Sequence, residues 1–170
     1  MQSEVYLGLG SNLGDKRGHI QRAVERLREV STGLTVSSFY ETAPVAVTLQ
    51  PPFVNAVCGL WTRLSVFELL TELRDIQREA GVRGPVLNGP RALDIDILLY
   101  GSLVVDLPHL TVPHPRMTER EFVLRPLAEI APGVVHPVMK KTAAEMLADL
   151  DGNSQRTPRP CPTGYRPSPV

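Results

Sequence analysis

The chain is poor in cysteine, in aromatic side chains and in net charge. Its 170 residues include two cysteines, Cys58 and Cys161, and only 5% aromatic residues, while 18 Lys and Arg balance 18 Asp and Glu. Two cysteines so far apart do not make a disulfide framework. A formal net charge of zero provides no broad basic surface for nucleic acid. These shortages exclude a disulfide-stabilised scaffold and argue against a nucleic-acid-binding domain.

Long apolar segments and targeting signals are also missing. No uninterrupted apolar stretch of the sequence approaches the length of a transmembrane helix. The first residues, Met1 to Glu4, lack the basic start and the apolar core of a signal peptide. We therefore expect a cytoplasmic protein without a membrane partner, present as a monomer or a weak homodimer.

The composition is that of one globular domain followed by a tail. Hydrophobic residues make up 42% and charged residues 21% of the chain, and about 150 residues can bury a substantial core. Residues 151–170 differ, because five of these 20 residues are proline and few are apolar. The sequence predicts a single domain over residues 1–150 and a flexible proline-rich tail over residues 151–170.

Hydrophobic periodicity predicts the order β-α-β-β-α-β for the first 100 residues. One apolar stripe of helical spacing follows the cap residue Asp15, and a second follows a capping box made by Ser65 and Glu68. This order is typical of the ferredoxin-like α+β fold, an antiparallel sheet with two helices on one face. The predicted strands cover residues 5–10, 35–40, 53–61 and 93–99.

The C-terminal third is expected to add a hairpin and short helices. Residues 102–106 read as one arm of a hairpin or as a short added strand. Capping boxes that begin at Thr118 and Thr142 predict two further helical starts, and Pro126 suits the first position of a turn between them. The last helix is predicted over residues 143–150.

Two alternating carboxylates lie within the apolar run of the fourth predicted strand. Side chains alternate along a strand, so the aliphatic residues at 93, 95, 97 and 99 point to one face and Asp94 and Asp96 to the other. This pair is either the solvated side of a half-buried strand or a cation site. Asp is a poor strand former, so two aspartates within an aliphatic run need a local reason such as a bound cation. Mg²⁺ is typically held by one or two carboxylates plus substrate phosphates. Arg91, just before the pair, carries a guanidinium whose shape suits phosphate oxygens.

Other polar or glycine positions allow two interpretations each. Gly8 and Gly10 do not complete a phosphate-binding loop, because Leu13 stands at the third glycine position; they mark a tight turn or a close approach of a ligand to the backbone. Asn55 either faces solvent or recognises a flat heterocycle with donors and acceptors. His114, fixed between two prolines, is either a surface residue or a phosphate ligand.

Short motifs occur in order at residues 8–14, 38–44, 53–55, 89–96 and 111–114. Taken together, they resemble those of the 6-hydroxymethyl-7,8-dihydropterin pyrophosphokinases of folate biosynthesis. The most specific is Gly89-Pro90-Arg91 followed by Asp94 and Asp96. The resemblance implies transfer of pyrophosphate from ATP to the hydroxymethyl oxygen of a reduced pterin, with release of AMP. The expected partners are therefore two small molecules, ATP and 6-hydroxymethyl-7,8-dihydropterin.

The resemblance also implies a role for individual residues. Asp94 and Asp96 would hold two Mg²⁺ ions that bridge the triphosphate, with Arg91 and Arg83 as further catalytic residues. The ATP-binding residues would be Arg91, Leu98, Leu110, Thr111, His114 and Arg120. The pterin-binding residues would be Thr42, Ala43, Pro44, Val45, Phe53, Asn55 and Phe122.

One segment departs from the family pattern. The family loop ahead of Gly-Pro-Arg usually carries several basic residues and a tryptophan, whereas residues 82–88 contain Arg83 alone and Asn88 stands where the tryptophan is expected. The alternative function is a non-catalytic or weakly active nucleotide- or pterin-binding relative with a degenerate loop. The same strand and helix order also serves RNA-binding modules, but these need exposed aromatics and a basic surface.

Overall fold

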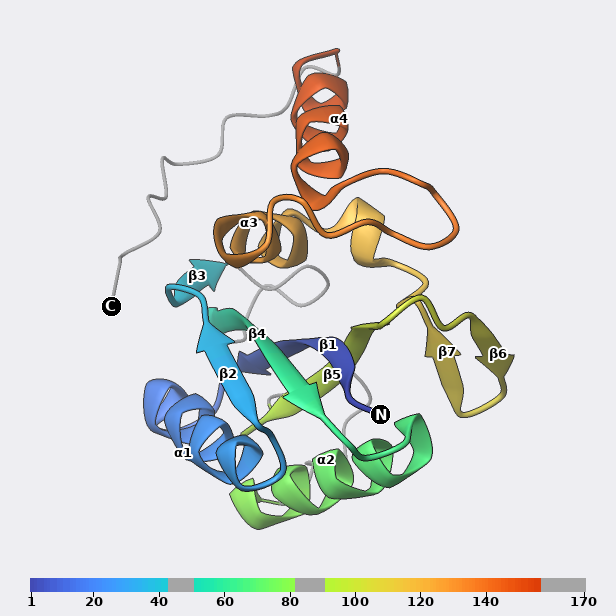
Figure 1. The fold of residues 1–170 in the computed structure, drawn as a ribbon. Coiled ribbons are helices and arrows are strands. Elements are labelled where there is room, and N and C mark those ends of the chain that lie inside the picture. The colour runs from blue at the N-terminus through green and yellow to red at the C-terminus, as the bar shows by residue number, and fades with distance from the viewer. Residues whose placement is uncertain (43–50, 82–90, 157–170) are drawn as a thin grey trace.

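An antiparallel sheet forms the middle of the molecule (Figure 1). The computed structural model describes residues 1–42, 51–81 and 91–156. Within the main sheet the order is β2-β4-β1-β5, β3 pairs with β4, and β6 and β7 form a separate two-stranded hairpin. The strands are β1 (Ser3–Ser11), β2 (Gly33–Val36), β3 (Tyr40–Thr42), β4 (Phe53–Thr62), β5 (Asp94–Tyr100), β6 (Val105–Leu107) and β7 (Leu110–Val112).

Helices cover both faces of this sheet (Figure 1). One face packs on α1 and α2 around an aliphatic core that includes Leu7, Ile20 and Leu69. The other face packs on α3, with α4 against α3, around a second core that includes Tyr6 and Leu124. The predicted ferredoxin-like α+β fold is confirmed, with α1 and α2 on one face. The helices are α1 (Lys16–Glu29), α2 (Val66–Ala80), the 3₁₀ turn η1 (Met117–Glu119), α3 (Glu121–Ile130) and α4 (Ala143–Arg156).

The first two helices begin where their capping residues predict. The Asp15 side chain accepts a hydrogen bond from the Gly18 N–H at 3.1 Å. Ser65 and Glu68 exchange side-chain and backbone hydrogen bonds as a complete capping box. These caps satisfy N–H groups that have no partner within the helix, so the start of each helix is fixed locally.

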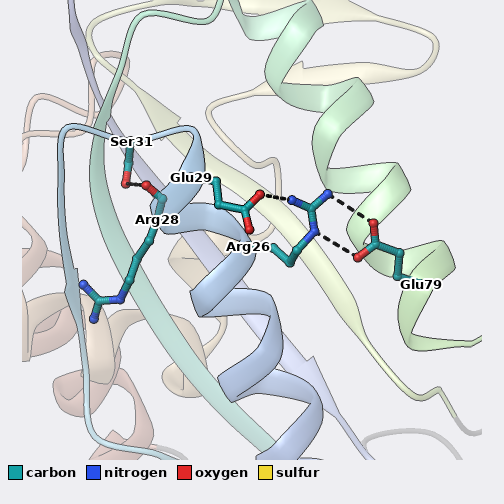
Figure 2. Close-up of polar contacts among 5 residues, drawn as sticks. All are labelled: Arg26, Arg28, Glu29, Ser31 and Glu79. Carbon is teal, nitrogen blue, oxygen red and sulfur yellow. Dashed lines mark hydrogen bonds and ion pairs between the residues drawn. The ribbon is translucent and has the colours of Figure 1, made fainter.

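Arg26 links the two helices on the face of the sheet that they cover. Its side chain extends from α1 to Glu79 on α2 with hydrogen bonds of 3.0 and 3.1 Å, and also pairs with Glu29 (Figure 2). At the end of α1 the Ser31 hydroxyl donates to the Arg28 carbonyl. Because ion pairs at the surface contribute little to stability, we expect this link to add little to the free energy of unfolding.

The predicted second strand, residues 35–40, is wrong as a single element. The structure has β2 and β3 with an irregular segment between them. In that segment the Ser37 N–H donates to the Val57 carbonyl, but the Val57 N–H donates to the Ser37 hydroxyl. A side-chain oxygen thus takes the place of a backbone carbonyl in the ladder, which interrupts the strand.

The C-terminal predictions are confirmed in part. The capping box at Thr142 forms with Glu145, but the box at Thr118 does not, because α3 begins after Arg120 without a side-chain cap. Pro126 lies inside α3 and is buried there. The prediction that Pro126 begins a helical turn is therefore wrong. The last helix extends beyond residue 150 to residue 156.

No helix in the described ranges has the length and apolarity that a membrane span requires.

A β-bulge in β5 changes the predicted alternation of its side chains. The pairing with β1 shifts between Tyr6 and Leu7 and leaves Leu98 as an extra residue. Leu98 and Leu99 both belong to the core on the α3 side, so the prediction that Leu99 shares the face of the preceding isoleucines is wrong. A bulge inserts one residue into a strand and thereby resets the alternation. The alternation predicted for residues 93–97 lies before the bulge and holds.

Candidate active site

Two glycines of β1 form an open floor between polar side chains on its two neighbours. Gly10 pairs with Asn55 of β4 on one side and with Asp94 of β5 on the other, and Gly8 pairs with Asp96. Directly paired residues point to the same face of a sheet. A Cβ atom at Gly10 would lie only 3.1 Å from the Asn55 Oδ1. Both glycines therefore lie inside a strand. A Cβ atom at Gly8 would contact the Leu98 side chain at 3.4 Å, so the open part of the floor is at Gly10, between the Asn55 amide and the two carboxylates.

The two carboxylates share the face of β5 that points away from α1 and α2. The Asp94 Oδ2 is 2.6 Å from an Nη atom of Arg91. Partial burial raises the pKa of Asp96 and the nearby Asp94 raises it further, whereas the neighbouring His114, Arg120 and Arg91 lower it. Within the described ranges, no three His, Cys, Asp or Glu side chains converge on one point. A cation here would have carboxylate ligands from Asp94 and Asp96 and its other ligands from water or substrate.

The bulge in β5 positions His114 beside Asp96. The His114 backbone N–H donates to the carbonyl of Leu98 at 2.9 Å, and the ring Nε2 lies 3.9 Å from the Asp96 Oδ2. Because Nδ1 accepts the Arg116 N–H at 3.2 Å, the neutral ring carries its proton on Nε2, toward Asp96. Burial lowers the pKa of His114, although Asp96 opposes this effect. The lowered pKa favours the neutral ring.

Arg120 and Phe122 bring a cation and an aromatic ring from the start of α3. The guanidinium carbon of Arg120 lies 5.6 Å from the centre of the Phe122 ring. Burial lowers the pKa of Arg120, Arg116 lowers it further and Asp96 raises it. Arginine remains charged at neutral pH. The start of α3 thus adds a cation near the carboxylate end of the glycine floor.

Asn55 borders the other end of the floor and is buried. Its Nδ2 donates to the Thr42 hydroxyl at 2.8 Å, which leaves Oδ1 directed toward Gly10. The ring of Phe53 also approaches this point, 3.9 Å from where a Gly10 Cβ would lie. Of the two interpretations of Asn55, exposure to solvent is wrong. The amide oxygen is held as an acceptor above open backbone, an arrangement that suits a flat polar ligand.

The arrangement of these residues agrees with a match to a known protein family. The family model described as 7,8-dihydro-6-hydroxymethylpterin-pyrophosphokinase (HPPK) matches residues 6–132. The chain belongs to the HPPK family. One HPPK relative, a 2-amino-4-hydroxy-6-hydroxymethyldihydropteridine pyrophosphokinase of Pseudomonas aeruginosa, is 45% identical over 140 residues, which cover 81% of this chain and 86% of the relative.

Other HPPK relatives are much longer proteins. The folic acid synthesis protein fol1 of Schizosaccharomyces pombe is 42% identical over 154 residues, which are 89% of this chain but 21% of that protein. The chain thus spans about a fifth of the length of this relative. A crystal structure of Plasmodium falciparum HPPK-DHPS with pteroate superposes with a TM-score of 0.72 at 14% identity, over 92% of this chain and 46% of the other. At that identity the likeness shows the fold.

The remaining residues that the HPPK resemblance implied lie in β7, in the two cores or outside the described ranges; Leu110 packs in the core on the α1 and α2 side of the sheet. Leu110 and Thr111 lie in β7, which contacts β5, and the Thr111 hydroxyl donates to Asp106 at 3.4 Å. Leu98 is the buried residue of the bulge. The structure brings together Arg91, Asp94, Asp96, His114 and Arg120. The predicted residues outside the described ranges are Ala43, Pro44, Val45 and Arg83.

Asn12 belongs to this site but was not predicted from the sequence. It is fully buried, its Oδ1 accepts the Arg91 N–H at 2.7 Å, and its own N–H donates to the Arg91 carbonyl at 3.0 Å. Its Nδ2 donates to the Pro51 carbonyl at 3.4 Å. Asn12 therefore connects the residue next to the carboxylates with the segment that enters β4. The signal was an asparagine after a glycine-rich strand, a residue type that bonds to nearby backbone.

Replacing Asn12 with alanine should lower the free energy of unfolding by about 1–3 kcal/mol, because it removes a fully buried side chain that accepts the partly buried Arg91 N–H. Urea denaturation followed by circular dichroism measures this loss. Gln21→Ala, an exposed position on α1, serves as the control and should change stability by less than about 0.5 kcal/mol. Equal effects of the two substitutions would contradict the role given to Asn12.

Proposed function

We propose that this chain transfers pyrophosphate from ATP to the hydroxymethyl oxygen of 6-hydroxymethyl-7,8-dihydropterin, giving the pterin diphosphate and AMP. The observation that carries the proposal is the open backbone of β1, which lies between Asn55 on β4 and the two carboxylates on β5. An amide with aromatic rings nearby suits a flat heterocycle. Carboxylates with arginine and histidine beside them suit a triphosphate and its cation. Membership of the HPPK family supports the same reaction.

Mg²⁺ is the expected cofactor, as two ions bound together with ATP. Asp94 and Asp96 would hold these ions, since both offer hard oxygen ligands on one face of β5. The donor set fits Mg²⁺, which is usually held by one or two carboxylates and takes its other ligands from water and substrate phosphates. When bound, the ions neutralise charge that develops on the transferred group and lower the pKa of the attacking hydroxyl.

The cationic and imidazole groups around the carboxylates would hold the triphosphate. Arg91 contacts Asp94 through one nitrogen, and its other N–H groups can donate to phosphate oxygens. The neutral ring of His114 would donate from Nε2, and Arg120 would add a positive charge. Holding both substrates in this way favours attack of the hydroxymethyl oxygen on the β-phosphorus, while the bond to the α-phosphate breaks and AMP leaves.

The pterin would lie over the Asn55 end of the floor. The Asn55 Oδ1 can accept an N–H of the ring, and the Thr42 hydroxyl holds the amide in that orientation. Phe53 and Phe122 would contact the faces of the ring, because stacked aromatic rings attract each other. With the ring there, its hydroxymethyl group can extend across β1 toward the carboxylates.

Incubation of the protein with ATP, Mg²⁺ and the pterin tests the proposal. We expect AMP and pterin diphosphate in equal amounts, and no AMP when the pterin is left out. Excess EDTA should stop the release of AMP and added Mg²⁺ should restore it, because the ions complete the site. Binding of both substrates without any AMP would overturn the proposed catalysis in favour of the non-catalytic alternative.

A further inference from the structure

Glu129, near the end of α3, fastens the segment that joins β2 to β3. One carboxylate oxygen accepts the Ser38 N–H at 2.8 Å and the Ser38 hydroxyl at 2.7 Å. The other accepts the hydroxyl of Tyr40. These hydrogen bonds connect residues about 90 positions apart in the sequence, as the separations of 91 and 89 residues show. A single carboxylate thus ties α3 to the start of β3.

The ionised form of Glu129 is the form that these contacts favour. Burial raises the pKa of Tyr40 to about 12, with the hydrogen bond to Glu129 as the next cause. Against the effect of burial, the hydrogen bonds from Tyr40 and Ser38 lower the pKa of Glu129. Hydrogen bonds to an ionised acceptor are stronger than those between neutral groups. The connection is therefore a charge-assisted one at neutral pH.

The strand that Glu129 fastens is short and carries a residue of the site. β3 has three residues and pairs with β4 alone within the described sheet, with Tyr40 opposite Asn55 and Thr42 opposite Phe53. So few ladder hydrogen bonds fix a strand only weakly. The Thr42 hydroxyl accepts a hydrogen bond from the Asn55 Nδ2, so the position of β3 determines where the Asn55 amide points.

We propose that Glu129 is a positioning residue for the pterin side of the site, a role that rests on the function proposed above. It acts through Ser38 and Tyr40 to hold β3 against β4. Thr42 then keeps the Asn55 Oδ1 directed over Gly10, where it can accept a hydrogen bond from a flat heterocycle. The carboxylates on β5 do not take part in this chain of contacts. Loss of Glu129 should therefore weaken binding of the pterin and leave binding of ATP unchanged.

Equilibrium titrations of the full chain with each substrate test this role. For Glu129→Ala we expect the pterin Kd to rise about tenfold, the change in Kd that matches the loss of a hydrogen bond to a charged group, and the ATP Kd to stay within about twofold. Tyr40→Phe removes one of the three hydrogen bonds and should give a smaller rise. Glu121→Ala is the matched control, because this glutamate of the same helix bonds to Arg125. It should leave both Kd values unchanged.

Two results would overturn the role. An unchanged pterin Kd in Glu129→Ala shows that β3 does not depend on this carboxylate. A parallel rise of both Kd values, with a lowered Tm, shows a general structural role instead of positioning. Because the readout is binding, the comparison still decides the role of Glu129 if the wild-type protein releases no AMP. A wild-type protein that does not bind the pterin overturns both proposals.

Discussion

Asp96→Asn should lower kcat by on the order of a hundred- to a thousandfold, the usual effect of removing one group that stabilises charge in a transition state. The amide keeps the shape of the side chain but removes the negative charge that would hold Mg²⁺ on β5. Binding of the pterin should stay within about twofold, because none of its proposed contacts lies on β5. Release of AMP measures the first quantity and titration with the pterin measures the second.

The same substitution should leave the fold intact. Partial burial and the nearby Asp94 raise the pKa of Asp96, whose side chain is 54% exposed, so its ionised form costs only a little stability at neutral pH, and this cost disappears as the pH falls below the ordinary carboxyl range. Without added metal, the Tm of Asp96→Asn at neutral pH should therefore equal or exceed that of the wild type. Asp75→Asn on α2 is the control and should retain full activity. Near-normal kcat in Asp96→Asn would rule out the metal-binding role.

Gly10→Val should weaken the pterin about ten- to a hundredfold, because the new side chain fills the open floor. A Cβ alone would lie 3.1 Å from the Asn55 Oδ1, and the branched methyl groups extend further into the space above β1. Overpacking of this kind costs about 1–3 kcal/mol, and 1.4 kcal/mol is a tenfold change in Kd. Titration with the pterin measures the loss, and a thermal melt verifies the fold, since valine suits a strand.

Gly133→Val provides the matched control for this change. A Cβ at Gly133 would meet no atom within 4 Å, so the same added volume should leave substrate binding as it is in the wild type. If Gly10→Val bound the pterin normally, the ligand would not lie over β1. The site would then have to be placed elsewhere on the sheet.

The parts of the fold that depend on near neighbours were predictable from the sequence. The caps at Asp15 and Ser65 act within three residues, so a short window of sequence contains all the information. The break after β2 depends on distant partners, because Ser37 bonds to Val57 and Ser38 bonds to Glu129. The bulge at Leu98 likewise arises from the pairing of β5 with β1. No local pattern contains these contacts.

The same distinction applies to the site. The shared face of Asp94 and Asp96 follows from strand alternation, so the sequence alone was enough to predict it. The floor at Gly10 was not predictable in this way, because it requires β1 to lie between β4 and β5, and Asn12 was missed because its partners are Arg91 and Pro51. The resemblance to a family supplied roles for single residues, and the sheet order shows how the described ones come together.

The row that runs from Asn55 through Gly10 to Asp94 crosses three strands of one sheet. Neighbouring strands are about 4.8 Å apart, so the two outer backbones in this row are separated by roughly 10 Å. Backbone hydrogen bonds maintain that spacing, and side-chain substitutions change it little. The sheet therefore fixes the distance between the Asn55 end and the carboxylate end of the site. With the pterin ring bound at β4, this fixed distance sets how far its hydroxymethyl oxygen must extend to reach the carboxylates on β5.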